Sequence, residues 1–396
     1  MDGGIDRICI IHNTHNGQSI YMKTKKTTLV ITSALVLLCL IAAPASAAGS
    51  GTSADPYIIT TADELQSMSN DLAAYYVLGN NIDLTGYAWT PIGSSTTPTA
   101  NGFHGTLDGQ GYAISNLSIN TNVSYAGLFS VITTGATLAN IDFVDCMVNG
   151  TTYVGTLFGA CLMASGVNVT ANILNIDTEN CNVTASGYYV GGIAGYSGTY
   201  ASVKFASCDV ANGAVTSTSG YSVGGIAGYG ATSNSQARFD ACHAFGMHVK
   251  ASGNYVGGIA GYGANSNSQA SFENGCSAVN CLIESTSGHY VGGIAGYGAY
   301  SNSQASFENG CSAVNCVLKG GTNVGGIAGA GAHSNSQASF ENCVAKLNSV
   351  RATNSYAGGI AGRIYDGCIG TFTDCISQYN SIVTGNYGAG ICPAWA

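Results

Sequence analysis

The sequence predicts an all-β fold, a right-handed parallel β-helix (solenoid) that begins with a short helical cap. Two observations lead to this prediction. The segment Tyr189–Tyr196, with the sequence YVGGIAGY, returns at intervals of 33 or 35 residues, and a fixed period of this size indicates stacked structural units. In addition, 46% of the residues are hydrophobic although only 8% are charged, which favours packed structure over disorder. The further copies are Val223–Tyr229, Val256–Tyr262, Val291–Tyr297, Val324–Ala330 and Ala357–Arg363.

One repeat predicts one turn of a three-faced coil. In the repeat that begins at Tyr255, we expect strands over residues 256–262, from 270 onward and over 276–284, with a polar turn at 263–269. Each strand would pair in register with its equivalents in neighbouring coils, about 4.8 Å away. The right-handed sense follows from the general preference for right-handed crossovers between parallel strands.

Composition and pattern divide the chain into five segments. Met22 opens a basic stretch, a short apolar run follows, and an A-x-A site predicts cleavage of a secretory signal peptide near Ala47. The apolar run is shorter than the roughly 20 residues that span a membrane; an uncleaved anchor is the competing interpretation. The segments are a non-native upstream extension at 1–21, the signal peptide at 22–47, a linker at 48–55, an N-terminal cap with the first irregular coils at 56–124, and the repeat β-helix at 125–396.

The N-terminal cap contains the one convincing helical pattern of the sequence. Thr61 and Glu64 have the spacing of a capping box, in which each side chain bonds the backbone amide of the other residue. Leu65, Met68 and Leu72 follow at spacings of three and four residues, which place them on one helical face. Because the end of a β stack is otherwise open, a terminal unit of different structure is expected there.

The order of the short motifs resembles that of secreted GLUG-motif repeat proteins. The motifs are Leu107-Asp108-Gly109, Ile114–Leu117, Ala126–Phe129 and the serial copies of Gly192–Gly195. The resemblance covers nearly all of the chain after the signal peptide. It implies a right-handed parallel β-helix on prokaryotic surface proteins and adhesins, and it offers no catalytic motif. This chain departs from the family by using Ile where Leu is frequent and by a longer insert per repeat.

Phenylalanine and cysteine recur at equivalent positions and predict stacked core columns. The columns are Phe143, Phe205, Phe239, Phe272, Phe307, Phe340 and Phe372, then Cys146, Cys208, Cys242, Cys276, Cys311, Cys343 and Cys375. Free cysteine packs as a small hydrophobe, so a buried thiol ladder is expected. Export also permits disulfides, for which Cys276/Cys281 and Cys311/Cys316 are the candidates. The chain has no C-x-x-C pair, which argues against zinc.

Two further columns hold the candidate binding residues. Tyr196, Tyr229, Tyr262 and Tyr297 end copies of the repeated segment, and Asn234, Asn267, Asn302 and Asn335 lie in the polar turns with Gln236, Gln269, Gln304 and Gln337. Strand alternation places Tyr196 opposite Ile193. A buried Ile193 therefore predicts an exposed tyrosine strip beside a polar array, suited to stacking on sugars. In the alternative, the tyrosines belong to the core and the amides form a structural ladder.

A column of acidic residues has three possible interpretations. Its members, Asp240, Glu273, Glu308 and Glu341, each follow a column phenylalanine. A solvated face is the simplest interpretation. A calcium-binding ladder is an alternative, because carboxylates about 4.8 Å apart can share a hard cation. Glycoside hydrolysis needs two carboxyl groups in different environments, and repetition works against that difference.

Five Asn-x-Ser/Thr sequons are possible glycosylation sites. They begin at Asn116, Asn122, Asn149, Asn168 and Asn182. All five lie in the N-terminal half of the chain, so any glycans would mark one end of the stack.

The sequence points to a non-enzymatic protein, secreted or at the cell surface, that serves adhesion, envelope structure or binding of a glycan or protein partner. No catalytic constellation, metal site or cofactor motif is apparent. The net charge of -9, without a basic stripe along the sequence, excludes nucleic acid as an expected partner. The alternatives are a polysaccharide-active β-helix enzyme, which needs acids and a base on neighbouring coils, and a stalk fragment of a larger surface protein.

Overall fold

The computed structural model describes residues 47–94, 101–120, 122–133, 135–162, 170–198 and 200–393. All of these residues belong to one compact unit, Ser46–Ala396. The predicted signal peptide lies outside the described residues except for Ala47, and so do the upstream extension and the sequon at Asn168.

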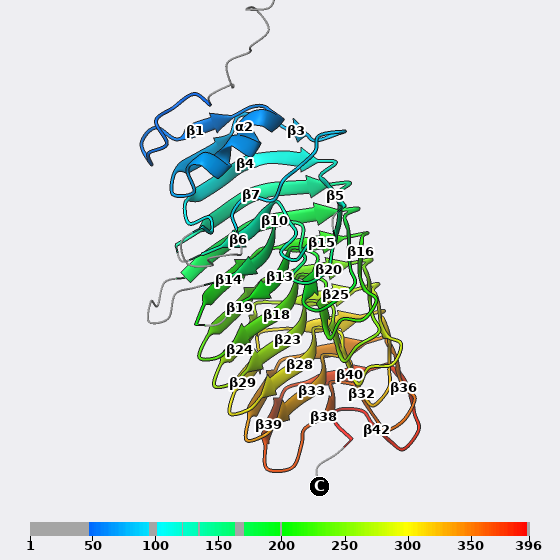
Figure 1. Ribbon diagram of the computed structural model, residues 1–396. Helices are drawn as coiled ribbons and strands as arrows, with labels where there is room; N and C mark the ends of the chain where they lie inside the picture. The colour runs from blue at the N-terminus through cyan, green and yellow to red at the C-terminus, as the bar shows by residue number, and fades with distance from the viewer. Residues whose placement is uncertain are drawn as a thin grey trace, which may run out of the picture. The chain divides into compact units, whose positions relative to one another are not determined.

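The described chain is a parallel β-solenoid, as predicted, and its strands form four sheets along the stack (Figure 1). The longest sheet has eighteen strands: β1 (Tyr57–Ile59), β2 (Tyr75–Leu78), β3 (Ile82–Asp83), β4 (Thr106–Ser115), β7 (Thr137–Val144), β10 (Thr170–Glu179), β14 (Ser202–Ala206), β15 (Asp209–Ala211), β19 (Gln236–Asp240), β20 (His243–Phe245), β24 (Gln269–Glu273), β25 (Ser277–Val279), β29 (Gln304–Phe307), β30 (Ser312–Val314), β34 (Gln337–Glu341), β35 (Val344–Lys346), β39 (Ile369–Thr373) and β40 (Ile376–Gln378).

The other three sheets each take one strand from successive coils. The nine-stranded sheet holds β5 (Ser118–Asn120), β8 (Met147–Gly150), β11 (Asn182–Ala185), β16 (Ala214–Ser217), β21 (His248–Ala251), β26 (Leu282–Ser285), β31 (Val317–Gly320), β36 (Ser349–Ala352) and β41 (Ser381–Thr384). The seven-stranded sheet holds β12 (Val190–Gly191), β17 (Ser222–Gly224), β22 (Tyr255–Gly257), β27 (Tyr290–Gly292), β32 (Asn323–Gly325), β37 (Tyr356–Gly358) and β42 (Tyr387–Ala389). The eight-stranded sheet holds β6 (Phe129–Ile132), β9 (Phe158–Cys161), β13 (Ala194–Ser197), β18 (Ala227–Thr232), β23 (Ala260–Asn265), β28 (Ala295–Tyr300), β33 (Ala328–His333) and β38 (Ala361–Arg363).

Each regular coil contains five short strands instead of the three that the sequence suggested. The expected strand over 256–262 is divided into β22 and β23, and the expected strand over 276–284 is divided into β25 and β26. The first division is a sharp bend, where a Cβ on Gly257 would lie 2.1 Å from the carbonyl oxygen of Ala260. The second lies at Asn280, whose φ of 57° is left-handed. Asparagine tolerates that backbone conformation better than most residues, so the chain turns a corner there.

The core is a set of columns with one residue per coil. The rings of Phe239, Phe272, Phe307 and Phe340 stack nearly parallel, with centroids 4.8 or 4.9 Å apart. This distance is the spacing of hydrogen-bonded strands. All four residues are buried, so each of these coils covers the aromatic ring of the one before it.

Two members of the predicted columns were placed wrongly. Phe143 is in register with Ile114 and Thr178, and not with Phe205, whose partner is Ile173. The reason is that β7 and β10 run through the corner at which later coils break into two strands. In these single long strands, the number of residues between equivalent positions of the coil differs from that in the later coils, so spacing in the sequence assigned Phe143 and Cys146 to the wrong columns. Cys146 therefore stacks with Cys181, in a second cysteine column.

The N-terminal cap contains the predicted helix, but the helical segment ends at Asn70, so Leu72 lies in the turn beyond it and not on the helical face. Helix α2 (Ala62–Ser67) continues into the 3₁₀ turn η1 (Met68–Asn70), and both bonds of the capping box between Thr61 and Glu64 are present. Leu65 and Met68 are fully buried against the first coil. Across the described ranges, no helix is long and apolar enough to cross a membrane.

Candidate functional site

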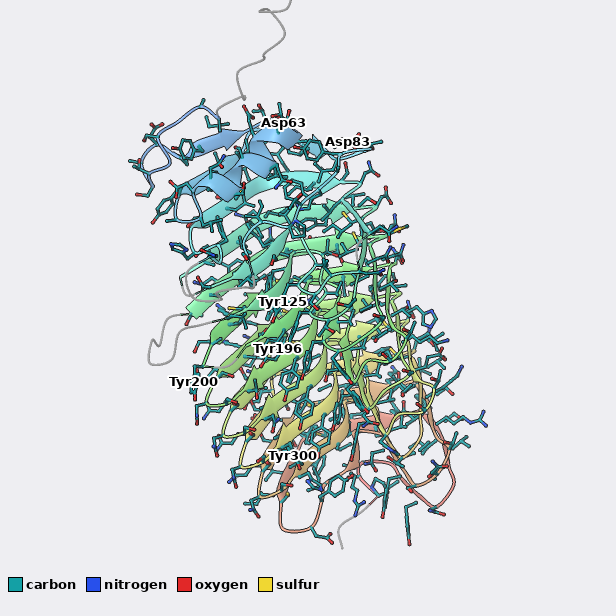
Figure 2. All side chains as sticks on the ribbon, viewed as in Figure 1. Asp63, Asp83, Tyr125, Tyr196, Tyr200 and Tyr300 are labelled. Atoms are coloured by element: carbon teal, nitrogen blue, oxygen red, sulfur yellow. The ribbon has the colours of Figure 1, made fainter. Side chains whose placement is uncertain are left out.

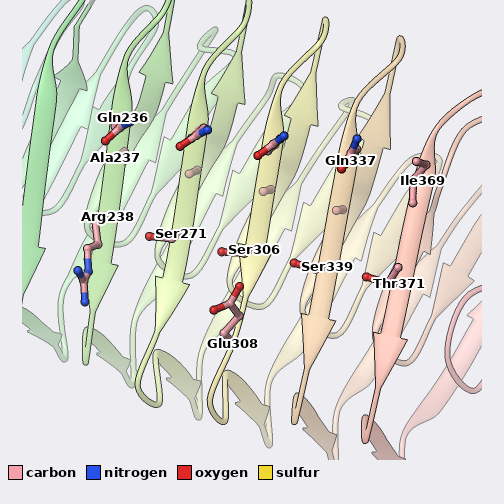
Figure 3. Close-up of a pocket in the computed structure, with 15 residues that line it drawn as sticks. Gln236, Ala237, Arg238, Ser271, Ser306, Glu308, Gln337, Ser339, Ile369 and Thr371 are labelled. Carbon is pink, nitrogen blue, oxygen red and sulfur yellow. The ribbon is translucent and has the colours of Figure 1, made fainter.

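A groove runs across the outer face of five neighbouring strands, β19, β24, β29, β34 and β39 (Figure 3). Its volume is about 390 Å³. Because the strands pair in register, equivalent residues of successive coils form rows across the groove. The row nearest the polar turns is Gln236, Gln269, Gln304, Gln337 and Ile369, and the next row is Arg238, Ser271, Ser306, Ser339 and Thr371.

The groove offers neutral hydrogen-bonding groups at regular intervals. Its four glutamines are exposed, and each carboxamide presents both donors and an acceptor. The charge of Arg238 is already compensated, because its Nη2 lies 2.9 Å from Glu273 and 3.2 Å from Asp240. The glutamine and serine rows therefore repeat the same neutral groups over the middle coils of the groove and suit a ligand that repeats along its own length. Glu308 adds one carboxylate to the lining.

The asparagine candidates lie in the turns that precede the glutamines and are not among the residues that line the groove. Asn234, Asn267, Asn302 and Asn335 are exposed and have left-handed φ values between 58° and 63°. Their backbones hold the turns together, since the N–H of Asn267 donates to the carbonyl of Ser301 over 3.1 Å. Their side chains are exposed, and their backbone conformation is part of the turn.

The ladder inside these turns is built by serine hydroxyls, which the sequence analysis overlooked. The N–H of Ser268 donates to Oγ of Ser303 over 3.1 Å, and the N–H of Ser303 donates to Oγ of Ser336 over 3.1 Å. All three serines are buried. Amide ladders do occur, but at the corners of the coils, as between Asn315 and Asn280 at 2.7 Å.

The prediction of an exposed tyrosine strip was wrong. Tyr229, Tyr262 and Tyr297 are only 6%, 4% and 2% exposed, and Tyr196 is half-buried. The second face of these strands is covered, because the bend after β22 folds that strand back beside β23. Tyr255 of β22 meets Tyr262 edge to face, with ring centroids 4.7 Å apart.

These tyrosines form a second apolar cluster, separate from the one that holds the phenylalanine column. Tyr196, which packs against this cluster, is labelled in Figure 2. The rings of Tyr229, Tyr262 and Tyr297 stack at 4.7 and 5.0 Å. Burial raises the pKa of all three phenols, so they stay neutral. The tyrosines do lie on the opposite face of the strand from the isoleucines, as expected. Both faces of the strand are covered, however, so the tyrosines are buried as well.

The predicted acidic column is occupied by ion pairs and amides. Asp240 accepts from Asn274 over 2.8 Å and lies 3.8 Å from Nζ of Lys204, in addition to its contact with Arg238. Among the described residues, no group of three or more His, Cys, Asp or Glu side chains is placed to hold a metal ion. The calcium interpretation of Asp240, Glu273, Glu308 and Glu341 thus receives no support from this geometry.

The cysteines form hydrogen-bonded ladders of free thiols at two corners of the coil. The Sγ of Cys276 donates to the carbonyl of Phe239 over 3.3 Å, and that of Cys316 donates to the carbonyl of Ala278 over 3.3 Å. Cys276 and Cys281, one of the candidate disulfide pairs, are both free and buried. In later coils, Asn348 takes over the same task with a 2.8 Å bond to Ala313.

The sequons differ in their local structure. Asn122 is exposed, whereas Nδ2 of Asn116 already bonds Asp83 over 2.8 Å. Asn149 is half-buried on β8, and Asn182 is exposed on β11, where its Oδ1 accepts from the N–H of Ala214. Asn122 is thus the sequon whose side chain is most accessible.

A row of three aspartates and a histidine was not foreseen from the sequence. Asp142, Asp177 and Asp209 are in register on β7, β10 and β15, and His243 follows on β20. Burial and the neighbouring aspartates raise the pKa of Asp177 to about 6. The Oδ1 of Asp209 is buried without a hydrogen-bond partner in the described structure. Part of the row could have been found from the residue that follows a column cysteine, as in Cys208-Asp209 and Cys242-His243. Asp142 and Asp177 follow isoleucines, so this pattern does not reveal them.

Comparisons with known proteins give partial matches. No family model matches the chain. A stretch of 104 residues, 24% of this chain and 12% of the relative, is 38% identical to a Gly-rich membrane protein of Evansella cellulosilytica. A stretch of 124 residues, 28% of this chain, is 32% identical to halomucin of Haloquadratum walsbyi and covers 1% of it. The chain thus spans a small part of these relatives, whose names fit a surface repeat protein.

Two solved structures match the chain at low similarity. A Bacteroides ovatus protein named as an immunoglobulin A1 protease is 17% identical with a TM-score of 0.42, over 87% of this chain and 86% of that one. The SRRP of L. reuteri 53608 is 10% identical with a TM-score of 0.25, over 83% and 99%. At these values neither structure informs the function of this chain.

Proposed function

We propose that this chain is a secreted or cell-surface repeat protein of the GLUG type that binds a neutral, linear glycan in the groove across β19 to β39. Cleavage near Ala47 would release the signal peptide before the protein reaches that location. The observation that carries the proposal is the pair of rows in which uncharged glutamines and serines recur at the spacing of the coils, between Arg238 at one end and Ile369 and Thr371 at the other.

The chemistry of the groove supports a carbohydrate ligand. Sugar hydroxyls both donate and accept hydrogen bonds, and so do the carboxamide of Gln304 and the hydroxyl of Ser306. The repeat of the protein along its axis is one strand spacing, about 4.8 Å, which is close to the length of one sugar residue. A linear glycan lying along the axis would thus meet equivalent groups on each coil. The names of the two partial relatives are consistent with this surface role.

The groove is tested by filling it. Ser306→Trp places a large ring in the middle of the groove, and Ser349→Trp places the same ring on an exposed position of β36, in another sheet. On a glycan array, we expect wild type and Ser349→Trp to bind the same neutral glycans and Ser306→Trp to lose at least tenfold in affinity. Equal binding by both variants would show that the groove is not the site.

A second candidate function is polysaccharide hydrolysis at the aspartate row. The observation that favours it is that acids and a base do lie on neighbouring coils, which an enzyme of this architecture needs. Asp177, with its raised pKa, could donate a proton to a leaving oxygen near pH 6. A neighbouring carboxylate, Asp209, stands about one strand spacing away, which matches the separation in retaining glycosidases.

Reducing-end release from a panel of polysaccharides, assayed at pH 6, decides between the two functions. Turnover by wild type that disappears in Asp177→Asn, with binding intact, would establish the hydrolase. Binding in the groove without turnover would leave a binding protein. Asp374→Asn, an exposed aspartate on the last coil, is the matched control and should behave as wild type in either case.

A further inference from the structure

The charged residues of the solenoid are segregated by face. The outward positions of the nine-stranded sheet carry Lys250, Lys319 and Arg351, with His248 beside Lys250. Within the described strands of this sheet, Glu284 is the one acidic residue. Residues 48–396 contain seven Lys and Arg against 18 Asp and Glu, so three cations around one acid are a marked local reversal of the overall charge.

Register brings these residues together although they are far apart in sequence. Lys250 pairs with Glu284, Glu284 with Lys319, and Lys319 with Arg351, on consecutive strands β21, β26, β31 and β36. Four adjacent coils place them within roughly 15 Å along the axis. The sequence analysis found no basic stripe because it examined the sequence in order, whereas this cluster, which we call the cationic row, exists only across coils.

The cationic row has more positive charge than its own acid can neutralise. Glu284 is shared by Lys250 at 3.1 Å, His248 at 3.5 Å and Lys319 at 3.8 Å. Within the described structure, Arg351 has no acidic partner and is exposed. Lys319 and Arg351 are also directly opposite each other, and like charges in that position are destabilising. An anion bound along the row would relieve this repulsion.

We propose that the cationic row is a second binding site, which takes a linear anionic polysaccharide lying along the solenoid axis. Its carboxylate or sulfate groups would pair with Arg351 and Lys319 and, beyond Glu284, with Lys250. The site is on a different sheet from the groove and needs different ligand chemistry. Nucleic acid fits less well, because single strands rely on aromatic stacking and the outward positions of this sheet, as described, carry no Phe, Tyr or Trp.

The test compares two double variants that remove the same total charge. Lys319→Gln/Arg351→Gln removes two of the three cations of the cationic row, and Lys204→Gln/Lys346→Gln removes two cations from the eighteen-stranded sheet at positions that do not line the groove. Binding is measured at several salt concentrations to immobilised polygalacturonate, heparin, dextran and single-stranded oligo-dT. We expect wild type and the second variant to bind one or both acidic polysaccharides and not dextran. Preference for polygalacturonate or heparin identifies carboxylate or sulfate as the group recognised.

The row variant should lose at least tenfold in affinity, and the slope of log Kd against log salt should fall by about 1.4, the value for two lost contacts with a flexible polyanion. Glu284→Gln should bind more tightly than wild type, because it releases Lys250 and Lys319. Three results would overturn the proposal: equal losses in both double variants, no binding of either acidic polysaccharide by the wild type, or tighter binding of oligo-dT. Circular dichroism of each variant confirms that the coil is intact.

Discussion

At the scale of single residues, the burial of a side chain depends on what covers its face of the strand. The sequence correctly placed Ile193 and Tyr196 on opposite faces. It could not show that β12 and β13 fold against each other, because this depends on close backbone contacts that glycine permits. A Cβ on Gly261 would lie 2.4 Å from the backbone nitrogen of Val223 in the preceding coil. The repeated glycines therefore bury the tyrosines by letting the backbones approach.

The tyrosine cluster predicts a large stability difference between two tyrosines of neighbouring coils. Tyr262→Ala removes a buried ring that contacts Tyr229, Tyr255 and Tyr297, and should lower the free energy of unfolding by about 3–5 kcal/mol. Tyr300→Ala is the control, because Tyr300 is 37% exposed, and should cost less than about 1 kcal/mol. Urea unfolding followed by circular dichroism measures both, and equal costs would contradict the assigned burial.

The aspartate row predicts an unusual dependence of stability on pH. The pKa of Asp177 in the folded state, about 6, lies above its unfolded value of about 3.9. Between these values the folded protein holds more protons than the unfolded chain, so this group makes stability fall as pH rises from about 4 to 6. Asp177→Asn should therefore stabilise the protein at pH 7 by about 1 kcal/mol, after allowance for solvent screening.

The measurement is the difference between variant and wild type in urea midpoint at pH 4 and pH 7. The difference should be small at pH 4, where Asp177 is largely protonated, and larger at pH 7. The titratable neighbours are Asp142 and Asp209 on the adjoining strands, His243 on the strand beyond Asp209, and Glu179 on the same strand as Asp177. They are unchanged in this comparison. A difference that does not vary with pH would mean that the carboxyl group of Asp177 has an ordinary pKa.

At the scale of strands and turns, the sequence predicted the repeated coils and missed the residues that turn the chain at the corners of each coil. Repetition located the coils and the phenylalanine column apart from Phe143, and the capping box located the helical cap. The division into five strands depends on left-handed residues such as Asn280, and asparagine is too common in this chain to mark those positions by itself. The groove was found only in part, since the glutamine column was recognised but its serine neighbours were not.

The polar turns predict opposite effects for two serines two residues apart. Ser266 has a left-handed φ of 58°, so Ser266→Gly should be neutral or stabilise the fold by up to about 1 kcal/mol. Ser268 accepts the backbone N–H of Ser235 through its hydroxyl, so Ser268→Ala should cost about 1–2 kcal/mol by leaving that buried donor unpaired. Thermal unfolding of both variants checks this pair, and destabilisation by Ser266→Gly would argue against the turn geometry.

At the scale of the whole molecule, each coil contacts chiefly the coil before it and the coil after it. Stability should then be close to a sum of coil and interface contributions. Deleting residues 256–290 removes one complete coil and joins Tyr255 directly to Val291, which restores the register. We expect a soluble β protein with a urea m-value lower in proportion to the lost surface.

Deleting residues 256–272 is the control, because it removes about half a coil and puts every following side chain out of its column. This variant should lose cooperative unfolding or fail to fold. If the two deletions behave alike, the coils are not independent units. Circular dichroism and urea titration compare the two proteins directly.

The in-register rows have a consequence for how such a protein changes over generations. Gain or loss of one repeat in the gene lengthens or shortens the groove by one row of glutamine and serine and leaves every other contact unaltered. The number of coils therefore sets the length of the groove. Its preference for longer or shorter ligands can be adjusted by copy number, without the invention of a single new side-chain contact.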